Sequence, residues 1–276
     1  MKNKIIIAAL AGIMLSSCGA YKKYQPVTAV DENLYGIESP GLDTTSIANI
    51  DWREMFTDKY LQSLIDSALV HNTDYQVAQL RTEQTMASLG AARLAYFPSI
   101  NLGADGSVSK YDGLTSKTCN IGANASWEVD IFGRLTAAKR GAAAAAVSAS
   151  ERAQAVKTQL VATVATSYYS LMMLDRQIEI ADTALANWTE SIRVMELLKD
   201  AGRANEPGIL QAKANKAGLQ ADIAAMKKSR KEIENSLCAI LGMTPCDIVR
   251  GSFENISFTD NFSTGLPVQL LANRPD

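Results

Sequence analysis

Large aromatic side chains, histidine and long apolar runs are all scarce in this 276-residue sequence. Aromatic residues make up 7% of the chain, so its apolar contacts must come mainly from alanine and aliphatic side chains. Beyond the N-terminus, no apolar run approaches the ~20 residues that a membrane-spanning helix needs. Lysine and arginine number 27 against 29 acidic residues, and this balance gives no indication of nucleic-acid binding.

Groups that carry out catalysis or bind metals are equally scarce. His71 is the only histidine and is predicted on a helix surface, and no two cysteines form a CxxC pair, so neither a metal nor a cofactor is expected. No phosphate-binding glycine loop and no G-x-S-x-G element occurs. Glu128 and Asp130 are the best carboxylate pair, but their spacing places both on the polar face of a predicted strand. We therefore expect a protein that is not an enzyme, since a hydrolase would need a nucleophile that the sequence does not identify.

The N-terminus has the features of an export signal. Lys2 and Lys4 precede an apolar segment, Ile5–Leu15, which is too short to span a bilayer. The residues that follow, Leu15-Ser16-Ser17-Cys18-Gly19, resemble a bacterial lipobox, which predicts a signal peptide over 1–17 and a lipid anchor on Cys18. The alternative is an ordinary secretory signal with a chance cysteine. Residue 19 is not aspartate, so the sorting rule of enteric bacteria predicts the outer membrane of a Gram-negative cell.

Three further cysteines are Cys119, Cys238 and Cys246. Gly242 and Pro245 would let the chain turn between the last two, and an exported protein meets conditions in which disulfides form. The sequence leaves two interpretations open for this pair, a disulfide or two small apolar core residues.

Helical periodicity dominates most of the chain. Residues 18–56 are polar and aperiodic, which predicts an extended tether, and a helix is expected over Thr57–Tyr96, capped by an aspartate and stopped by Pro98. A second helix is predicted over Leu135–Lys199 and a third over Glu206–Leu241. Each of the last two has an apolar seam typical of coiled coils: Leu171, Leu174, Ile178, Ala181, Leu185, Trp188, Ile192 and Met195 in one, and Leu219, Ile223, Met226, Ile233, Leu237 and Ile240 in the other, with Arg230 interrupting.

The lengths of these helices predict how they pack. The middle helix is far longer than the one that returns along it, so part of its seam would lie exposed. The helix Thr57–Tyr96 has about the length needed to fill the gap. We therefore expect one continuous helix beside a composite helix made of two segments stacked end to end.

Two long alternating segments predict a β-hairpin. Strands are expected over Ser99–Tyr111 and Thr118–Ile131, joined by a turn from Tyr111 to Lys117. Each strand has one apolar and one polar face. Such a hairpin could cover a soluble core or form part of a membrane barrel with a wet lumen, and the pattern alone favours neither. In the barrel interpretation the lumen would be lined by Asn101, Asp105, Asn120, Asn124 and Ser126.

Three stretches resemble one family, the TolC-like outer membrane factors. Trp127-Glu128-Val129-Asp130-Ile131-Phe132-Gly133-Arg134 is similar to the family's strand-to-helix motif, Ala95–Ile100 to its helix-to-strand junction, and Leu266–Asp276 to the motif that opens its second repeat. With the lipobox, the resemblance is to the lipoprotein branch, found in tripartite efflux pumps. It implies a mainly α fold whose long helices form part of a periplasmic α-barrel, and a hairpin that joins a trimeric outer-membrane β-barrel.

The resemblance also implies a domain organisation and a function. Residues 57–265 would form the first structural repeat and 266–276 the start of a missing second one, in a fragment or a truncated gene. The implied function is a non-enzymatic channel that exports drugs or other small molecules, as a homotrimer in outer-membrane lipid, with a periplasmic adaptor and an inner-membrane pump as partners. The adaptor-docking tip would be Gly202, Arg203, Ala204, Asn205 and Glu206. The alternative is that the chain is itself a periplasmic adaptor lipoprotein with a helical hairpin.

Overall fold

The computed structural model describes residues 51–253. The predictions for the signal peptide, Cys18, most of the tether and the segment 266–276 lie outside these residues. Within them the order of elements is α2 (Trp52–Met55), α3 (Lys59–His71), α4 (Thr73–Leu94), β1 (Ser99–Tyr111), β2 (Leu114–Ser126), α5 (Arg134–Asp200) and α6 (Glu206–Ile240). The predicted mainly α fold with a single hairpin is confirmed for this part of the chain. No helix in the range 51–253 is both long and apolar enough to cross a membrane.

The long helix and its return partner have the predicted bounds to within one residue at each end. Helix α5 has 67 residues, which corresponds to about 100 Å at the ~1.5 Å rise of an α-helix. Its predicted seam is buried or half-buried throughout, as is that of α6. Pro207 lies in the first turn of α6, where its missing N–H leaves no hydrogen bond unmade.

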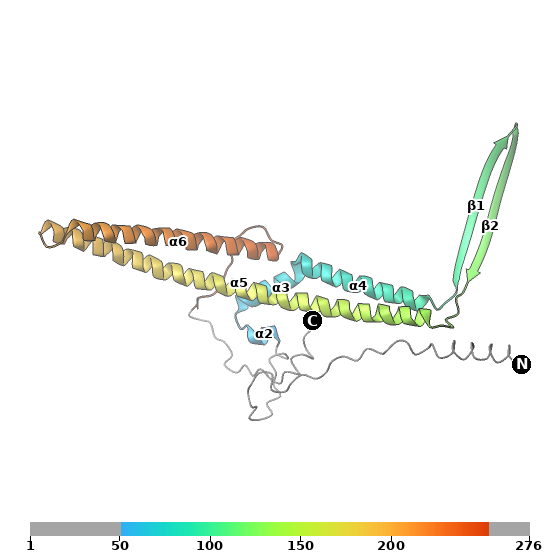
Figure 1. The fold of residues 1–276 in the computed structure, drawn as a ribbon, viewed down its shortest axis with the longest axis horizontal. Coiled ribbons are helices and arrows are strands. Elements are labelled where there is room, and N and C mark those ends of the chain that lie inside the picture. The colour runs from blue at the N-terminus through green and yellow to red at the C-terminus, as the bar shows by residue number, and fades with distance from the viewer. Residues whose placement is uncertain (1–50, 254–276) are drawn as a thin grey trace, which may run out of the picture. The chain divides into compact units, whose positions relative to one another are not determined.

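The composite helix is also present (Figure 1). Helices α3 and α4 pack along the N-terminal part of α5, and α6 packs along the C-terminal part. The two segments meet end to end, since the Asn72 side-chain amide donates to the carbonyl oxygen of Ile240 at 3.0 Å. A Cβ on Gly242 would lie 3.2 Å from the carbonyl oxygen of His71, so the ends of α3 and α6 are in close contact.

One detail of the predicted first helix and one of the predicted tether are wrong. It is not continuous, because Asn72 has an extended backbone that ends α3, while its side-chain oxygen accepts from the Tyr75 amide and starts α4. The predicted tether is likewise not extended to its end. Trp52–Met55 forms the short helix α2. Asp51 is its N-cap, because the Asp51 carboxylate accepts a hydrogen bond from the Arg53 amide at 2.8 Å.

The second strand was predicted too late in the sequence. Asp112 and Gly113 both have positive φ, 48° and 79°, which makes a two-residue turn, so β2 begins at Leu114. Pairing starts at Ser99 opposite Ser126, because Pro98 has no N–H to continue the ladder. Val129 and Ile131 are therefore not part of the strand, and the expected turn from Tyr111 to Lys117 is wrong.

The main core lies where α3, the middle of α5 and the end of α6 meet. Fully buried side chains there include Leu61, Ile65, Tyr168, Leu171 and Leu237. Helix α4, in contrast, buries none of its residues although it packs against α5. Both strands are exposed along their whole length. Residues 51–253 thus have one large packed core, and no part of this range covers the hairpin or fully buries a residue of α4.

Candidate functional site

The junction between β2 and α5 is organised around the carboxylate of Asp130. It accepts hydrogen bonds from the backbone amides of Leu135 and Thr136, both at 2.9 Å, and from the Thr136 hydroxyl at 2.7 Å. Gly133 supplies the left-handed conformation before the helix, with φ of 75°. The carboxylate therefore satisfies donors that the first turn of any helix leaves unpaired, and its charge matches the helix dipole.

Two further contacts tie the same junction together. The Trp127 indole N–H donates to the carbonyl oxygen of Tyr96 at 3.0 Å, which joins the end of β2 to the end of α4. The Arg134 guanidinium binds both carboxylate oxygens of Glu128, with Nε 2.8 Å from one of them. The five predicted junction residues are thus brought together, and each has a local structural role.

The predicted placement of Glu128 and Asp130 on a strand face is wrong. The strand ends at Ser126, and both carboxylates belong to the loop that leads into α5. Apolar and polar residues continue to alternate after Ser126, and the prediction therefore extended the strand too far. A sequence signal for capping is expected at the residue directly before a helix, where Gly133 stands, so the role of Asp130 three positions earlier had no standard signal.

Asp130 makes the junction sensitive to acid. The Thr136 hydroxyl first, and then the two amides and the charge of Arg134, hold the pKa of Asp130 below its usual range. A lowered folded-state pKa means that the cap stabilises the fold above about pH 4 and is lost as the pH falls through the folded value.

We expect Asp130→Ala to speed amide hydrogen exchange at Leu135 and Thr136 at neutral pH. The variant Asp130→Asn keeps an acceptor but loses the charge, so its exchange rates should lie between those of Asp130→Ala and the unmodified chain. The difference between the unmodified chain and Asp130→Asn should shrink as the pH falls through the lowered folded-state pKa of Asp130. Unchanged exchange in Asp130→Ala at neutral pH would contradict a capping role.

The register of the hairpin separates polar from apolar residues. Asn101 lies opposite Asn124, and Asp105 lies opposite Asn120, whose side-chain amide donates to the Asp105 carboxylate at 3.1 Å. Ser99 and Ser126 form the same kind of pair near the junction, with their hydroxyl oxygens 2.7 Å apart. All five residues predicted to line a lumen therefore share one face of the sheet.

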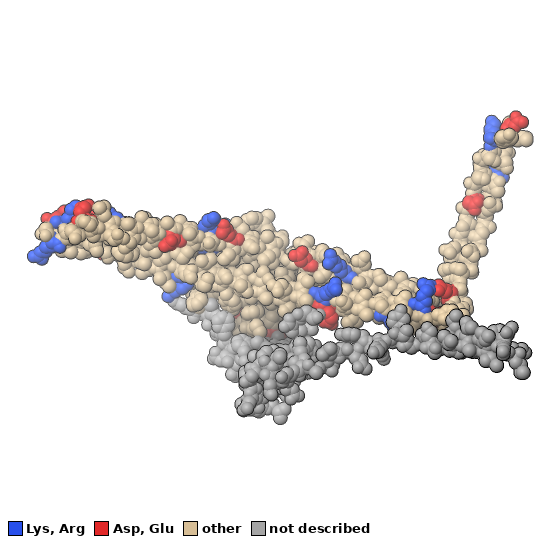
Figure 2. Space-filling model, viewed as in Figure 1, with Lys and Arg blue, Asp and Glu red and all other residues tan. Residues whose placement is uncertain are grey.

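The opposite face is apolar from the junction as far as the pair Gly106 and Cys119, beyond which Lys117 lies opposite Val108. Ile100, Leu102 and Ala104 are paired with Ala125, Ala123 and Ile121. Leu102 and Ile121 are 82% and 85% exposed, so no part of the described chain covers this face. Lys110, Asp112 and Lys117 add charge at the turn, and Figure 2 shows charged atoms gathered at that end of the hairpin.

The tip between α5 and α6 is a well-formed helix cap. The Gly202 amide donates to the carbonyl of Lys199 at 2.8 Å and the Arg203 amide to that of Leu198 at 2.7 Å, with Gly202 at φ of 73°. This is the Schellman pattern, in which glycine takes the left-handed position. Asn205 then caps α6 by accepting from the Gly208 amide. Gly202 and Asn205 are therefore explained by the turn itself.

The remaining tip residues differ in their contacts. Glu206 forms an ion pair with Lys199 across the turn, while Ala204 is half-buried. Arg203 is exposed, and its guanidinium has no ion-pair partner among residues 51–253. Figure 2 shows that charges of both signs crowd this end of the α5–α6 pair. Of the five predicted tip residues, Arg203 alone carries a charge not used within the turn.

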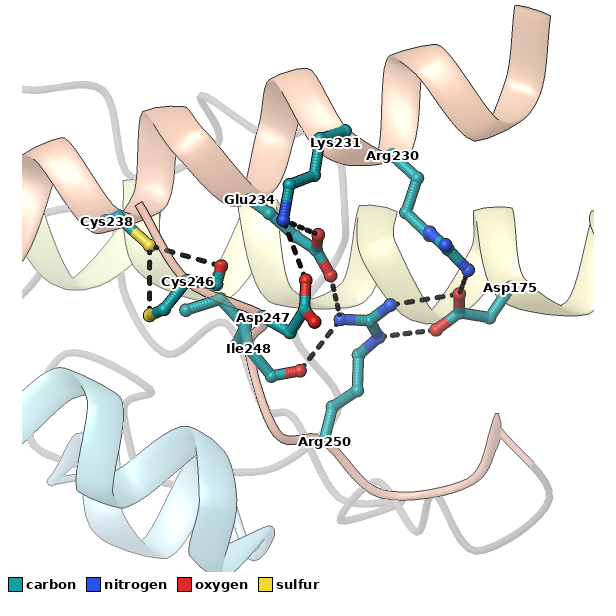
Figure 3. A network of polar contacts seen from close by, with 9 residues as sticks. All are labelled: Asp175, Arg230, Lys231, Glu234, Cys238, Cys246, Asp247, Ile248 and Arg250. Carbon is teal, nitrogen blue, oxygen red and sulfur yellow. Dashed lines mark hydrogen bonds and ion pairs between the residues drawn. The ribbon is translucent and has the colours of Figure 1, made fainter. Parts of the chain in front are cut away.

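The sequence interpretation missed one polar network, where the chain beyond α6 folds back (Figure 3). The Arg250 guanidinium binds Asp175 of α5 and the buried Glu234 of α6, the latter at 2.8 Å. Arg230, predicted only as an interruption of the seam, also lies 3.3 Å from Asp175. The sequence could have indicated a pair between Asp175 on α5 and Arg230 on α6, because both helices were predicted. It could not indicate Arg250, because this residue lies in a loop after α6. Within the described residues, no cluster of three or more histidine, cysteine, aspartate or glutamate side chains could hold a metal ion.

Residues 51–253 therefore combine paired long helices, a capped junction and a hairpin with one apolar and one polar face, and nothing in this range covers the hairpin. The family model for outer membrane efflux proteins matches residues 64–243. The chain belongs to this outer membrane efflux protein family, and the predicted resemblance is confirmed.

Individual relatives agree with the family assignment. The chain is 27% identical over 274 residues to the cation efflux system protein CusC of Escherichia coli O6:H1, covering 96% of this chain and 59% of CusC. It is 25% identical over 292 residues to the probable efflux pump outer membrane protein TtgC of Pseudomonas putida, covering 100% of this chain and 60% of TtgC. The crystal structure of the open state of the Neisseria gonorrhoeae MtrE outer membrane channel superposes with a TM-score of 0.77 at 25% identity, covering 92% of this chain and 58% of MtrE. The chain thus spans about 60% of the length of these relatives.

Proposed function

We propose that this protein contributes the outer-membrane channel of a tripartite efflux system that exports drugs or other small molecules. The observation that carries the proposal is the uncovered two-faced hairpin, joined through a capped junction to the long helices of an outer membrane efflux protein. A channel of this kind needs shape and a wet path rather than a catalytic group, so we propose that the protein is not an enzyme.

The dimensions of the hairpin support its insertion in an outer membrane. The apolar face from Ile100 to Val108 corresponds to about 27 Å along an antiparallel strand. A tilt of about 40° gives about 21 Å along the membrane normal, close to the ~25 Å apolar band of outer-membrane barrels. Lys117, the cross-strand partner of Val108, and Lys110 then lie on the same face at the far end of this band, where their long side chains can reach water.

A shared barrel requires further copies of the chain. Two strands cannot close a barrel, and the smallest membrane barrels have about eight. The uncovered surface of α4 calls for additional neighbours in the same way, because a packed helix normally buries one face. We propose a homotrimer in which residues 57–265 act as the first repeat and 266–276 begin the second, so that each protomer would supply four strands and the barrel would have about twelve.

Labelling of introduced cysteines tests the channel directly. In the assembled protein with Cys119→Ala, a water-soluble thiol reagent should modify Asn120→Cys and Asn124→Cys at least about tenfold faster than Ile121→Cys and Ala123→Cys, because the first pair would face a wet lumen and the second pair lipid. A large channel-blocking reagent should also lower export in the first pair. Equal labelling of both pairs would contradict the barrel.

Cys18 is proposed as the lipid anchor of the protein in the outer membrane. We expect Cys18→Ser to lose all incorporation of labelled fatty acid, since serine has no thiol to form the thioether. The variant Ser17→Ala retains the small residue before the cysteine and should label normally. Labelling of Cys18→Ser at the level of the unmodified protein would show that the lipobox assignment is wrong.

An adaptor and an inner-membrane pump are the proposed partners, with the tip 202–206 as the docking point on the adaptor. The alternative, that the chain is itself an adaptor, is not favoured, because it belongs to the outer membrane efflux protein family. Charge reversal at Arg203 tests this docking point.

A further inference from the structure

The last turn of α6 and the segment that follows it bring two thiols into contact. The Sγ atoms of Cys238 and Cys246 lie 3.5 Å apart, and the Cys238 thiol is 3.6 Å from the carbonyl oxygen of Cys246 (Figure 3). A bonded pair of sulfurs is about 2.05 Å apart, so each sulfur would need to move by about 0.7 Å. Cys246 lies in a loop, which can take up such a movement. We propose that Cys238 and Cys246 form an intrachain disulfide in the mature protein.

The backbone already holds the two residues in a closed turn. The Met243 amide donates to the carbonyl of Cys238 at 2.9 Å, and Gly242 has φ of 65°, which turns the chain back toward the helix. Cys238 is fully buried, whereas Cys246 is half-buried. One thiol is therefore accessible to an oxidising partner, and the other is positioned to complete the bond.

The bridge would act on the segment that Figure 3 shows crossing α5 and α6. Four residues after Cys246, Arg250 reaches Asp175 and Glu234, and the Gly251 amide donates to the Tyr168 hydroxyl at 3.0 Å. Tyr168 in turn donates to the Asp58 cap of α3 at 2.6 Å. A covalent link at Cys246 fixes the start of this segment, so it acts as a strap across the point where the composite helix is joined.

The reaction is a thiol–disulfide exchange and rests on export as proposed above. The Cys246 thiolate attacks an exchangeable disulfide of an envelope dithiol oxidase, which releases one thiolate and forms a mixed disulfide. The Cys238 thiolate then attacks the Cys246 sulfur and releases the second thiolate. The two cysteines lose two protons and two electrons, which reduce the oxidase. The hydrogen bond with Cys238, followed by partial burial, raises the pKa of Cys246, so the folded pair reacts slowly without such a catalyst.

Peptide mass analysis measures the bridge directly, because trypsin cuts after Lys231 and Arg250 and so releases both cysteines in the single peptide 232–250. Envelope fractions are quenched in acid, alkylated without reduction under denaturing conditions and digested. We expect the peptide to carry no alkyl group and to be lighter by two hydrogens, while Cys119 in the same sample is alkylated. After reduction, the peptide should gain two alkyl groups. A doubly alkylated peptide in the unreduced sample, or a bond between two chains, would overturn the proposal.

Stability and variants give a second readout. Reduction of the purified protein should lower its melting temperature by about 5 to 10 °C, from the loop-closure entropy of a short disulfide loop in a chain of this size. The double variant Cys238→Ala/Cys246→Ala should not respond to reductant, and Cys119→Ala should respond like the unmodified protein. A reductant-insensitive melting temperature in the unmodified protein would count against the strap.

Export and bridge formation can fail separately. If the protein is absent from the envelope fraction, the proposed export is wrong, and the bridge is then tested on purified protein with oxidised glutathione. Formation of the bonded peptide 232–250 under those conditions supports the contact. Mixed disulfides with glutathione on both cysteines, with no bonded peptide, would overturn it.

Discussion

Replacing Arg250 with methionine is expected to lower the free energy of unfolding by about 3 kcal/mol, because removing one partner of a buried ion pair leaves the other charge uncompensated. The Arg250 side chain is 11% exposed and that of Glu234 only 4%. Without Arg250, the Glu234 carboxylate would retain one ion-pair contact, at 3.5 Å to Lys231. The lower end of the usual 3–5 kcal/mol range is chosen because Asp175 is 36% exposed and can be hydrated.

Two matched variants separate charge from geometry at this site. Arg250→Lys keeps the charge but cannot bind Asp175 and Glu234 with a planar fork, so it should be intermediate in stability. The double variant Arg250→Met/Glu234→Gln removes the stranded charge and should be more stable than Arg250→Met alone. Denaturant unfolding of the purified protein measures the effect, with a fall in melting temperature of about 6 to 12 °C as a second readout. A loss below about 0.5 kcal/mol in Arg250→Met would contradict the argument.

The same network has a pH dependence of known sign. Partial burial alone would raise the pKa of Asp175, but hydrogen bonds and charge from Arg250 and Arg230 outweigh it and hold this pKa below its usual range. The ion pair therefore stabilises the fold above about pH 4 and is lost as the pH falls through the folded value. Arg250→Met should accordingly lose part of the acid sensitivity of the unmodified protein.

Reversing the charge at the tip with Arg203→Glu is expected to lower crosslinking to the adaptor about tenfold and to raise drug sensitivity. The Arg203 side chain is exposed, and its charge is not used within the turn, whereas Lys199 and Glu206 neutralise each other. A partner that accepts this cation would face a carboxylate in the variant, and like charges in an interface cost enough free energy to account for a tenfold loss. The Schellman turn uses only the backbone amide of Arg203, so folding should be unaffected.

The matched control is Arg193→Glu. This residue lies on α5 about 15 Å before the tip and pairs with Glu190 on the same helix. It should leave crosslinking and drug resistance unchanged, and both variants should assemble and insert normally. Normal crosslinking of a well-assembled Arg203→Glu protein would rule out this arginine. If substitutions at Gly202 and Ala204 were also without effect, the tip would not be the docking site.

Local periodicity by itself determined the long elements of this protein. The seams of α5 and α6 could be read directly, because a continuous helix places every third or fourth side chain on one face regardless of what covers it. Their ends could be read for a similar reason, since Gly202, Asn205 and Pro207 act within a few residues of their own position. The relative lengths of these helices were enough to predict the composite helix.

The hairpin shows where local pattern was sufficient and where it was not. Alternation identified both faces, and the register confirms that Asn101, Asp105, Asn120, Asn124 and Ser126 lie together. The strand limits depended on pairing, because Pro98 cannot continue the ladder and Asp112–Gly113 forms a tight turn. The alternation past Ser126 therefore had no partner, and Glu128 and Asp130 were assigned to the wrong element.

Only the tertiary structure decided the contacts between segments distant in sequence. Asn72 breaks the first helix where it can bond the end of α6, 168 residues later. Arg250 binds Asp175, which lies 75 residues earlier. Arg230, which interrupts the apolar seam of α6, binds the same carboxylate and so belongs to this charge network. A side chain's hydrogen-bond partner is set by where the packed helices bring the backbone. No period within a single helix carries that information.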